Sequence, residues 1–334
     1  MVRMTVVGAG SWGSAFAYYL GRLGFPTRLW VREEDIFLDL LQTRINRTFL
    51  PGYFFPQTVT FHKNLAEAVD GAEVIYIAVP SQYCRQVYLR LSDFLEKGQA
   101  VVSLTKGLEQ KTQKRMTEVM KEVFPKEKKI KTAVLSGPSF AREVAAGHPT
   151  ALVLASRDKN LARELQATIS SLQLRIYTSS DVVGVELCGA VKNIIAIAAG
   201  ISDGLGYGNN SRASLITRGL VEMTRLGLAL GARKETFSGL AGLGDLVLTC
   251  TSEMSRNYHV GLELTRGKSL RQILSEMRMV AEGVRNTLTV FKLAHQKKIE
   301  MPICQRVYEV LYHGQPAHKA LEELMSRDLK EEKI

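Results

Sequence analysis

Apolar residues in the first half of the chain fall into short continuous runs, separated by segments of helical periodicity. A short β-branched run that ends at a turn signal predicts a buried strand. The predicted strands cover residues 4–7, 27–31, 73–79, 100–104, 132–135 and 150–155. Strands that alternate with helices favour a parallel sheet with helices on both faces.

The pattern changes near residue 180, beyond which β-branched runs are rare and apolar residues recur every three to four positions. The predicted helices cover residues 182–202, 211–230, 256–266, 269–278, 283–297 and 303–312. A chain of 334 residues is long enough for two domains of ordinary size. We therefore predict an α/β domain over residues 1–180 and an all-α domain over residues 181–334.

The composition and the spacing of cysteines and histidines indicate which kinds of site to expect. Apolar residues make up 46% of the chain and charged residues 23%, which is typical of a globular protein with a substantial core. The four cysteines form no C-x-x-C pair, and no histidine pairs with a carboxylate at the spacing of metal ligands. We therefore expect no metal site and no disulfide framework, as suits a reducing cytoplasm.

Membrane segments are not expected. No stretch reaches the ~20 uninterrupted apolar residues that a membrane-spanning helix needs. The longest candidate, residues 191–205, contains Lys192 and Asp203 and is interrupted by glycines. The apolar periodicity begins at residue 4, which argues against a signal peptide. The sequence thus predicts a soluble intracellular protein with no integral membrane segment.

Basic residues outnumber acidic residues by 44 to 33, so the formal net charge is +11. Such an excess fits nucleic acid, a membrane surface or a small anion. Ten lysines and arginines stand against four acidic residues between Lys106 and Arg142, and much of this excess lies in residues 126–131. Because only Phe124 lies close enough to stack on a base, we interpret the segment as a solvated loop and expect no nucleic-acid partner.

Three glycines form the pattern Gly8-x-Gly10-x-x-Gly13 between the first predicted strand and the first predicted helix. In this context Gly8 permits a tight turn, Gly10 lets the backbone approach a pyrophosphate, and Gly13 allows the helix to pack closely on the strand. The N-terminus of the helix then presents N–H groups to the anion. The pattern predicts a Rossmann-like dinucleotide site.

The choice between NAD and NADP depends on the end of the second strand. An acidic residue there accepts a hydrogen bond from a ribose 2′-hydroxyl, whereas an arginine accommodates a 2′-phosphate. The strand ends at Arg32, which favours NADP modestly. Glu33 and Glu34 follow directly and leave NAD open.

Lys192 stands in an apolar helical segment rich in small residues. Desolvation of an ammonium is costly unless the group faces a cleft or a partner. A lysine whose pKa is lowered by burial suits proton exchange with a carbonyl oxygen. Snorkelling of the side chain to the surface is the alternative.

Anion-binding residues follow other predicted elements. Ser255-Arg256-Asn257 stands where a helix begins, and a capping serine beside an arginine and an asparagine suits a phosphate monoester. Lys106-Gly107 follows one predicted strand, and Ser136-Gly-Pro-Ser139 follows another. The carboxyl ends of strands form the ligand crevice of a doubly wound sheet, so we expect these residues on the same side as the glycine turn.

Taken together, the motifs closely resemble the bacterial NAD(P)-dependent sn-glycerol-3-phosphate dehydrogenase family over residues 3–325. The resemblance implies a Rossmann-like domain, a helical domain like that of 6-phosphogluconate dehydrogenase, a cytoplasmic location and a homodimer. It further implies reduction of dihydroxyacetone phosphate to sn-glycerol 3-phosphate for phospholipid synthesis. The motifs on which the resemblance rests are Val7-Gly-Ala-Gly-Ser-Trp-Gly13, Ala78-Val-Pro-Ser81, Thr105-Lys-Gly107, Ser136-Gly-Pro-Ser-Phe-Ala141, Gly189-Ala-Val-Lys-Asn193, Leu240-Ala-Gly-Leu-Gly-Asp245 and Ser255-Arg-Asn257.

The resemblance also assigns roles to single residues, with Lys192 as the proton-transferring lysine. The positions that match substrate contacts are Lys106, Gly137, Ser139, Lys192, Asp245, Ser255, Arg256 and Asn257. The positions that match cofactor contacts, beside Gly8, Gly10 and Gly13, are Ser11, Trp12, Arg32, Lys106, Ala141, Arg256, Val280 and Glu282.

Two other functions stay open at this point. A hydroxyacid or ketopantoate reductase would share the dinucleotide site but would need a receptor for a carboxylate. A non-catalytic module that senses NAD(P) would need neither Lys192 nor the Ser255-Arg256-Asn257 receptor, so the presence of both disfavours it.

Overall fold

The computed structural model describes residues 2–277, 279–329 and 331–332, and these residues form two compact units. The first unit comprises Met1–Lys106 and Lys114–Val182, and the second comprises Gly107–Gln113 and Val183–Ile334. The continuous split predicted near residue 180 differs from this in one segment, 107–113. That segment groups with the helices, where the Leu108 amide donates to Asn286 Oδ1 at 3.3 Å.

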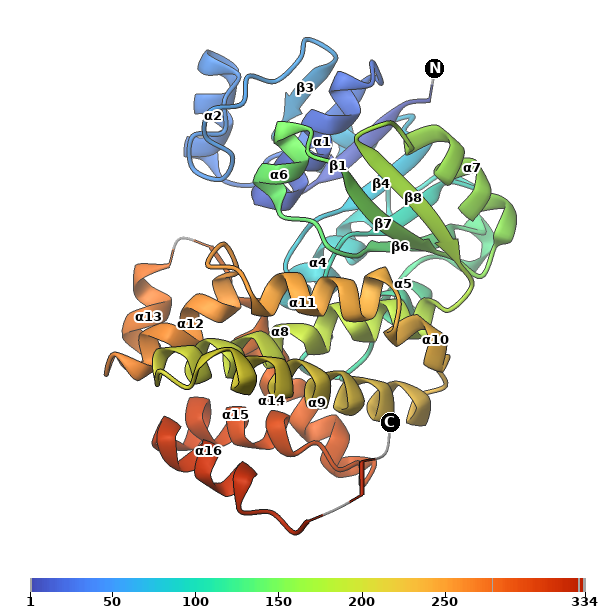
Figure 1. The fold of residues 1–334 in the computed structure, drawn as a ribbon. Coiled ribbons are helices and arrows are strands. Elements are labelled where there is room, and N and C mark those ends of the chain that lie inside the picture. The colour runs from blue at the N-terminus through green and yellow to red at the C-terminus, as the bar shows by residue number, and fades with distance from the viewer. Residues whose placement is uncertain (1, 278, 330, 333–334) are drawn as a thin grey trace. The chain divides into compact units, whose positions relative to one another are not determined.

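The first unit contains one sheet of eight strands in the order β3-β2-β1-β4-β5-β6-β7-β8 (Figure 1). All neighbouring strands are parallel except β6 and β7, which correct the expectation of a wholly parallel sheet. The strands are β1 (Met4–Val7), β2 (Thr27–Trp30), β3 (Val59–His62), β4 (Val74–Ile77), β5 (Ala100–Ser103), β6 (Lys131–Ser136), β7 (Thr150–Ala155) and β8 (Leu174–Ser179). The strand order reverses between β1 and β4, which is where open α/β sheets bind ligands.

The six predicted strands are all present, but the sequence pattern missed β3 and β8. These two strands form the edges of the sheet. Their side chains alternate between buried and exposed positions at the start of each strand, so neither strand reads as a continuous apolar run.

Two apolar cores lie on opposite faces of the sheet, because successive strand residues point to opposite sides. In β4, for example, Val74 and Tyr76 belong to one core, and Ile75 and Ile77 belong to the other. The first core contains side chains of α1 (Ser11–Arg22), α2 (Glu34–Thr43), α6 (Ala141–Ala146) and α7 (Lys159–Ile169). The second contains side chains of α3 (Leu65–Val69), α4 (Ser81–Ser92) and α5 (Met116–Val123). The basic segment at 126–131 forms a short 3-10 turn, Lys126–Lys128, before β6 begins.

The second unit is helical in its described residues. The predicted helix 269–278 is shorter than expected, and its last position lies outside the described residues. The helices are α8 (Val182–Gly204), α9 (Gly208–Ala229), α10 (Lys234–Phe237), a π-helix (Leu240–Gly244), α11 (Asp245–Cys250), α12 (Arg256–Thr265), α13 (Leu270–Glu276), α14 (Glu282–Gln296), α15 (Pro302–His313) and α16 (Ala317–Met325) (Figure 1).

Helix α8 is the one described helix that is long and apolar enough to cross a membrane, with a mean hydropathy of 1.8 over its best window. Of that window, 94% is buried inside the protein. Burial of this extent is the property of a core helix, so length and composition alone do not make α8 a membrane segment.

Close packing between α8 and α12 depends on Gly200. A Cβ at this position would lie 2.0 Å from the carbonyl oxygen of Tyr258 and 3.1 Å from the Cα of Gly261. We expect Gly200→Ala to lower the free energy of unfolding by about 3 kcal/mol, because two backbones would have to separate. Denaturant titration measures this loss. Gly239→Ala is the control, since its added Cβ meets nothing closer than 3.4 Å; an equal loss in both variants would contradict the steric explanation.

Candidate functional site

The glycine turn connects β1 to α1 and packs backbone against backbone. Gly8 has a φ of +113°, which only glycine adopts readily, and its Cβ would lie 2.7 Å from the Ala78 carbonyl oxygen. A Cβ at Gly13 would lie 1.9 Å from the carbonyl oxygen of Gly8. The turn therefore tolerates no side chain at either position.

Gly10 differs from these two glycines, because a Cβ there would meet no atom within 4 Å. Open space on this side lets a ligand approach the backbone. Gly10 is also the N-cap of α1, and no side chain caps the helix. The first N–H groups of a helix lack intrahelical partners and attract anions.

Trp12 also presents a polar group at this turn. Its indole Nε1 is buried and has no hydrogen-bond partner among the described residues. Leaving a buried donor unpaired costs ~1–3 kcal/mol, and an acceptor oxygen on a bound molecule would remove that cost. The turn, the uncapped helix and Trp12 together fit the phosphates of a dinucleotide.

The end of β2 carries mixed charges. Arg32 Nη2 lies 2.6 Å from Glu33 Oε1, and the Arg32 guanidinium lies 5.3 Å from the centre of the Tyr83 ring. Lys63 Nζ pairs with Glu34 Oε2 at 2.8 Å. A ribose 2′-phosphate would have to replace Glu33 as the partner of Arg32, whereas a 2′-hydroxyl could use Glu33 as it stands. This arrangement accommodates either nicotinamide cofactor.

Three predicted substrate contacts meet at the carboxyl ends of β5 and β6. Lys106 Nζ donates to the Gly137 carbonyl at 2.8 Å and lies 3.4 Å from Ser139 Oγ. The Ser139 hydroxyl donates to the same carbonyl at 3.0 Å. Because β1, β4, β5 and β6 are parallel, this group lies at the same edge of the sheet as the glycine turn. Ala141 is the first residue of α6, and Ser11 is the first residue of α1.

In the helical unit, Lys192 forms a buried ion pair. Its Nζ donates to Asp245 Oδ1 at 2.6 Å and to Thr249 Oγ1 at 2.7 Å. The Lys192 side chain is 6% exposed and that of Asp245 is 1% exposed. The structure thus excludes the snorkelling alternative. Burial is compensated here by a charge partner and a hydroxyl, as a buried ammonium requires.

Cys250 lies beside this ion pair at the end of α11. Burial raises the pKa of its thiol to about 12, although the Lys192 ammonium acts in the opposite direction. The thiol is therefore neutral at physiological pH. All four cysteines are buried, and among the described residues none is in a disulfide.

Ser255 is the N-cap of α12, which confirms the predicted helix start. Its hydroxyl accepts the Tyr258 N–H at 3.2 Å. Arg256 is exposed to solvent, yet desolvation lowers its pKa, and the Glu282 carboxylate opposes that shift. A cation that is accessible, partly desolvated and without a hydrogen-bonded partner among the described residues is well suited to bind an anion.

Asn257 has a structural role that the sequence did not predict. Its amide Nδ2 donates to Asn193 Oδ1 at 2.9 Å, and its Oδ1 accepts the Gly283 N–H at 2.9 Å. The side chain therefore joins α8 to the start of α14. A phosphate contact from Asn257 would have to use its second amide hydrogen or its backbone N–H.

Sequence reasoning also missed Thr249, which contacts Lys192. Thr249 stands four residues after Asp245, so the two side chains share one face of α11. That spacing was the available signal, but nothing in the sequence showed that this face meets Lys192.

Val280 lies between α13 and α14, and Glu282 is the first residue of α14. Val280 lines a cavity of about 360 Å³ in the helical unit, together with Leu274, Met277 and Arg285. No group of three or more histidine, cysteine or acidic side chains in the described part of the chain could hold a metal ion.

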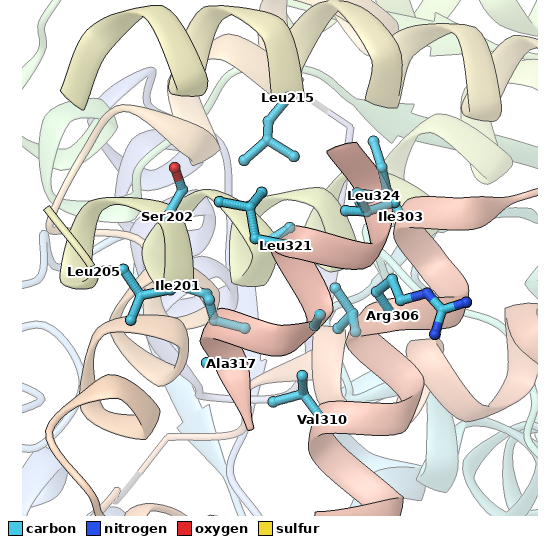
Figure 2. Close-up of a pocket in the computed structure, with 13 residues that line it drawn as sticks. Ile201, Ser202, Leu205, Leu215, Ile303, Arg306, Val310, Ala317, Leu321 and Leu324 are labelled. Carbon is cyan, nitrogen blue, oxygen red and sulfur yellow. The ribbon is translucent and has the colours of Figure 1, made fainter. Parts of the chain in front are cut away.

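A second cavity in the helical unit is almost wholly apolar (Figure 2). It has a volume of about 30 Å³, enough for one water molecule. Its one charged lining residue, Arg306, is paired with Glu309 and Glu323. The cavity thus lacks the available charge that a phosphorylated substrate requires.

Two family models match consecutive parts of the chain. Residues 3–162 match the model described as NAD-dependent glycerol-3-phosphate dehydrogenase N-terminus. Residues 181–322 match the model described as NAD-dependent glycerol-3-phosphate dehydrogenase C-terminus. The two matches together cover most of the sequence.

Full-length relatives agree with these models. Glycerol-3-phosphate dehydrogenase (NAD(P)+) of Geobacter sp. strain M21 is 48% identical over 332 residues, and that of Geobacter sulfurreducens is 49% identical over 331 residues; each alignment covers 99% of both chains. The crystal structure of glycerol-3-phosphate dehydrogenase from Coxiella burnetii superposes with a TM-score of 0.94 at 41% identity, covering 98% of this chain and 99% of that chain. The match confirms the Rossmann-like sheet followed by a helical domain.

Proposed function

Because the chain belongs to the NAD-dependent glycerol-3-phosphate dehydrogenase family, we propose that it reduces dihydroxyacetone phosphate reversibly to sn-glycerol 3-phosphate with NADH or NADPH. The observation that carries this proposal beyond the family is the buried Lys192–Asp245 pair in the same unit as the solvent-accessible Arg256. The Lys192 ammonium is a group that can transfer a proton, and the Arg256 guanidinium is a group that can recognise a phosphate.

The glycine turn would hold the dinucleotide, which supplies a hydride when bound. Gly10 and the N-terminus of α1 would bind its phosphates, and Trp12 would donate to one of its oxygens. We keep Arg32 and Ala141 as proposed cofactor contacts of the first unit, and Lys106, Gly137 and Ser139 as its proposed substrate contacts.

In the helical unit, Arg256 would bind the substrate phosphate, helped by the N-terminus of α12. An arginine–phosphate contact is charge-assisted and geometrically specific, so it fixes the orientation of the carbonyl group. Orientation of this kind can supply several kcal/mol toward the barrier.

Lys192 would give a proton to the oxygen of the carbonyl as that oxygen becomes an alkoxide. Asp245 and Thr249 hold the ammonium in place through hydrogen bonds of 2.6 and 2.7 Å. An ammonium fixed in a buried site also stabilises the developing negative charge without reorganisation during the reaction.

A steady-state assay tests the proposed function. We expect oxidation of NADPH or NADH that depends on dihydroxyacetone phosphate, with no turnover of 2-keto acids. Absence of turnover with both cofactors, in protein that binds a dinucleotide, would favour a sensing module. Preference for a keto acid would favour the carboxylate-binding reductases.

Arg32 offers a test of cofactor preference, which we propose leans toward NADP. Arg32→Ala should raise the KM for NADPH about tenfold, the effect of losing one charge-assisted contact to a phosphate, and should leave the KM for NADH nearly unchanged. Glu33→Gln is the matched variant, because it frees Arg32 from its carboxylate partner and should lower the KM for NADPH. An equal effect of Arg32→Ala on both cofactors would remove the 2′-phosphate assignment.

We further propose a cytoplasmic homodimer that feeds phospholipid synthesis, as the family resemblance implies. Light scattering coupled to size exclusion tests the oligomeric state. A mass near the 37.1 kDa of one chain would exclude the dimer.

A further inference from the structure

Asn46 lies beyond α2 in the loop that leads to β3, and its side chain reaches back to the glycine turn. Its Nδ2 donates to the Ala9 carbonyl oxygen and to Ser14 Oγ, both at 2.9 Å. Its Oδ1 accepts the Phe49 N–H, also at 2.9 Å. Asn46 and Ser14 are fully buried, so these bonds are shielded from water.

The Ala9 carbonyl oxygen accepts two side-chain hydrogen bonds. Ser14 Oγ donates to it at 3.0 Å, in addition to the bond from Asn46. Asn46, Ser14 and the Ala9 carbonyl thus form a closed group of mutual hydrogen bonds. A rotation of the 9–10 peptide would leave two buried donors without this acceptor, which is costly.

The orientation of this carbonyl determines where the next N–H points. The peptide between Ala9 and Gly10 is trans and planar, so its C=O and N–H point in opposite directions. Because the oxygen faces Asn46, the Gly10 N–H faces the other way. No described residue accepts this N–H, and a Cβ at Gly10 would meet no atom within 4 Å.

The orientation of the Ala9–Gly10 peptide needs hydrogen bonds to fix it, because the glycines of the turn do not restrict the backbone. Rotation of the Ala9–Gly10 peptide changes the ψ of Ala9 and the φ of Gly10, and Gly10 accepts φ values that other residues avoid. In the rotated form a carbonyl oxygen, in place of an N–H, would face the bound anion.

We propose that Asn46 is a positioning residue for dinucleotide binding: it locks the Ala9–Gly10 peptide so that the Gly10 N–H is presented to a phosphate oxygen. This inference rests on the proposed function only in that the glycine turn binds a dinucleotide. Asn46 is fully buried, and we infer that it acts through the Ala9 carbonyl.

The test compares dinucleotide affinity in purified full-length variants by fluorescence titration with NADPH and with NADH. Asn46→Ala should raise the Kd for both about tenfold, which corresponds to ~1.4 kcal/mol. At saturating cofactor and substrate its kcat should stay within about twofold of wild type. A residue that only positions the cofactor-binding turn affects binding and not the chemical step.

Gln99→Ala is the matched control for lost stability. Gln99 is a buried amide of the same unit that also donates to a carbonyl, Ala72 O at 2.7 Å, and accepts the Glu96 N–H at 2.7 Å. It should lower the melting temperature comparably and leave the Kd unchanged. Equal weakening of binding in the two variants would overturn the positioning role.

Ser14→Ala keeps the test decisive if Asn46→Ala does not fold. Alanine is well tolerated in a helix, and the change removes one of the two donors to the Ala9 carbonyl. It should raise the Kd about threefold, corresponding to ~0.65 kcal/mol. A Kd equal to that of wild type in the folded variants would overturn the inference alone, whereas wild-type protein that binds neither dinucleotide would overturn the proposed function as well.

Discussion

Replacement of Lys192 by alanine is expected to lower kcat by roughly 10²–10⁴-fold, the usual contribution of a positioned proton donor. The affinity for NADPH should change little, because Lys192 is not among the proposed cofactor contacts. Single-turnover kinetics and fluorescence titration measure the two quantities separately. A comparable loss of cofactor affinity would mean that Lys192 supports the fold and does not act in the chemistry.

The variant also leaves Asp245 without its ion-pair partner in a buried site. Such a change typically costs ~3–5 kcal/mol of stability, so a loss of folding could resemble a loss of catalysis. The double variant Lys192→Ala/Asp245→Asn removes the unpaired charge and should recover stability but not activity. Lys192→Arg keeps the charge with a group that does not release its proton, and should also be inactive.

Replacement of Arg256 by alanine should raise the KM for dihydroxyacetone phosphate by roughly 10–100-fold, the effect of losing a hydrogen bond to a charged group. Steady-state kinetics at saturating cofactor measure this change. The result to expect with dihydroxyacetone, which lacks the phosphate, is a KM equal to that of wild type. A similar increase with both substrates would show that Arg256 does not recognise the phosphate.

Arg266 provides the matched control for this prediction. It stands at the other end of α12, where its guanidinium pairs with Glu263. Arg266→Ala removes the same charge from the same helix and should leave the KM unchanged. An increase in this variant too would point to a general loss of positive charge and not to a specific receptor.

The features that the sequence predicted are local ones. The glycine turn could be identified because its strand, its turn and its helix are continuous in the chain, and Ser255 could be identified as an N-cap for the same reason. The burial of Lys192 followed from its apolar neighbours in one helix.

The features that the sequence did not predict depend on partners far along the chain. Asn257 bonds to Asn193, 64 residues away, and Asn46 bonds to Ala9, 37 residues away. The sequence around Asn257 predicted only a phosphate contact, and that around Asn46 predicted no role, so these bonds follow only from the tertiary structure. A single sequence contains no signal for such pairs, because hydrophobic periodicity specifies which face of an element is buried but not what it meets.

The neutral thiol of Cys250 has a consequence for how the protein withstands oxidants. Oxidants and alkylating reagents attack the thiolate, and a thiol with a pKa of about 12 is almost never in that form. The other three cysteines are buried as well. We therefore expect oxidants and alkylating reagents to react slowly with Cys250 and to leave the neighbouring Lys192–Asp245 ion pair intact.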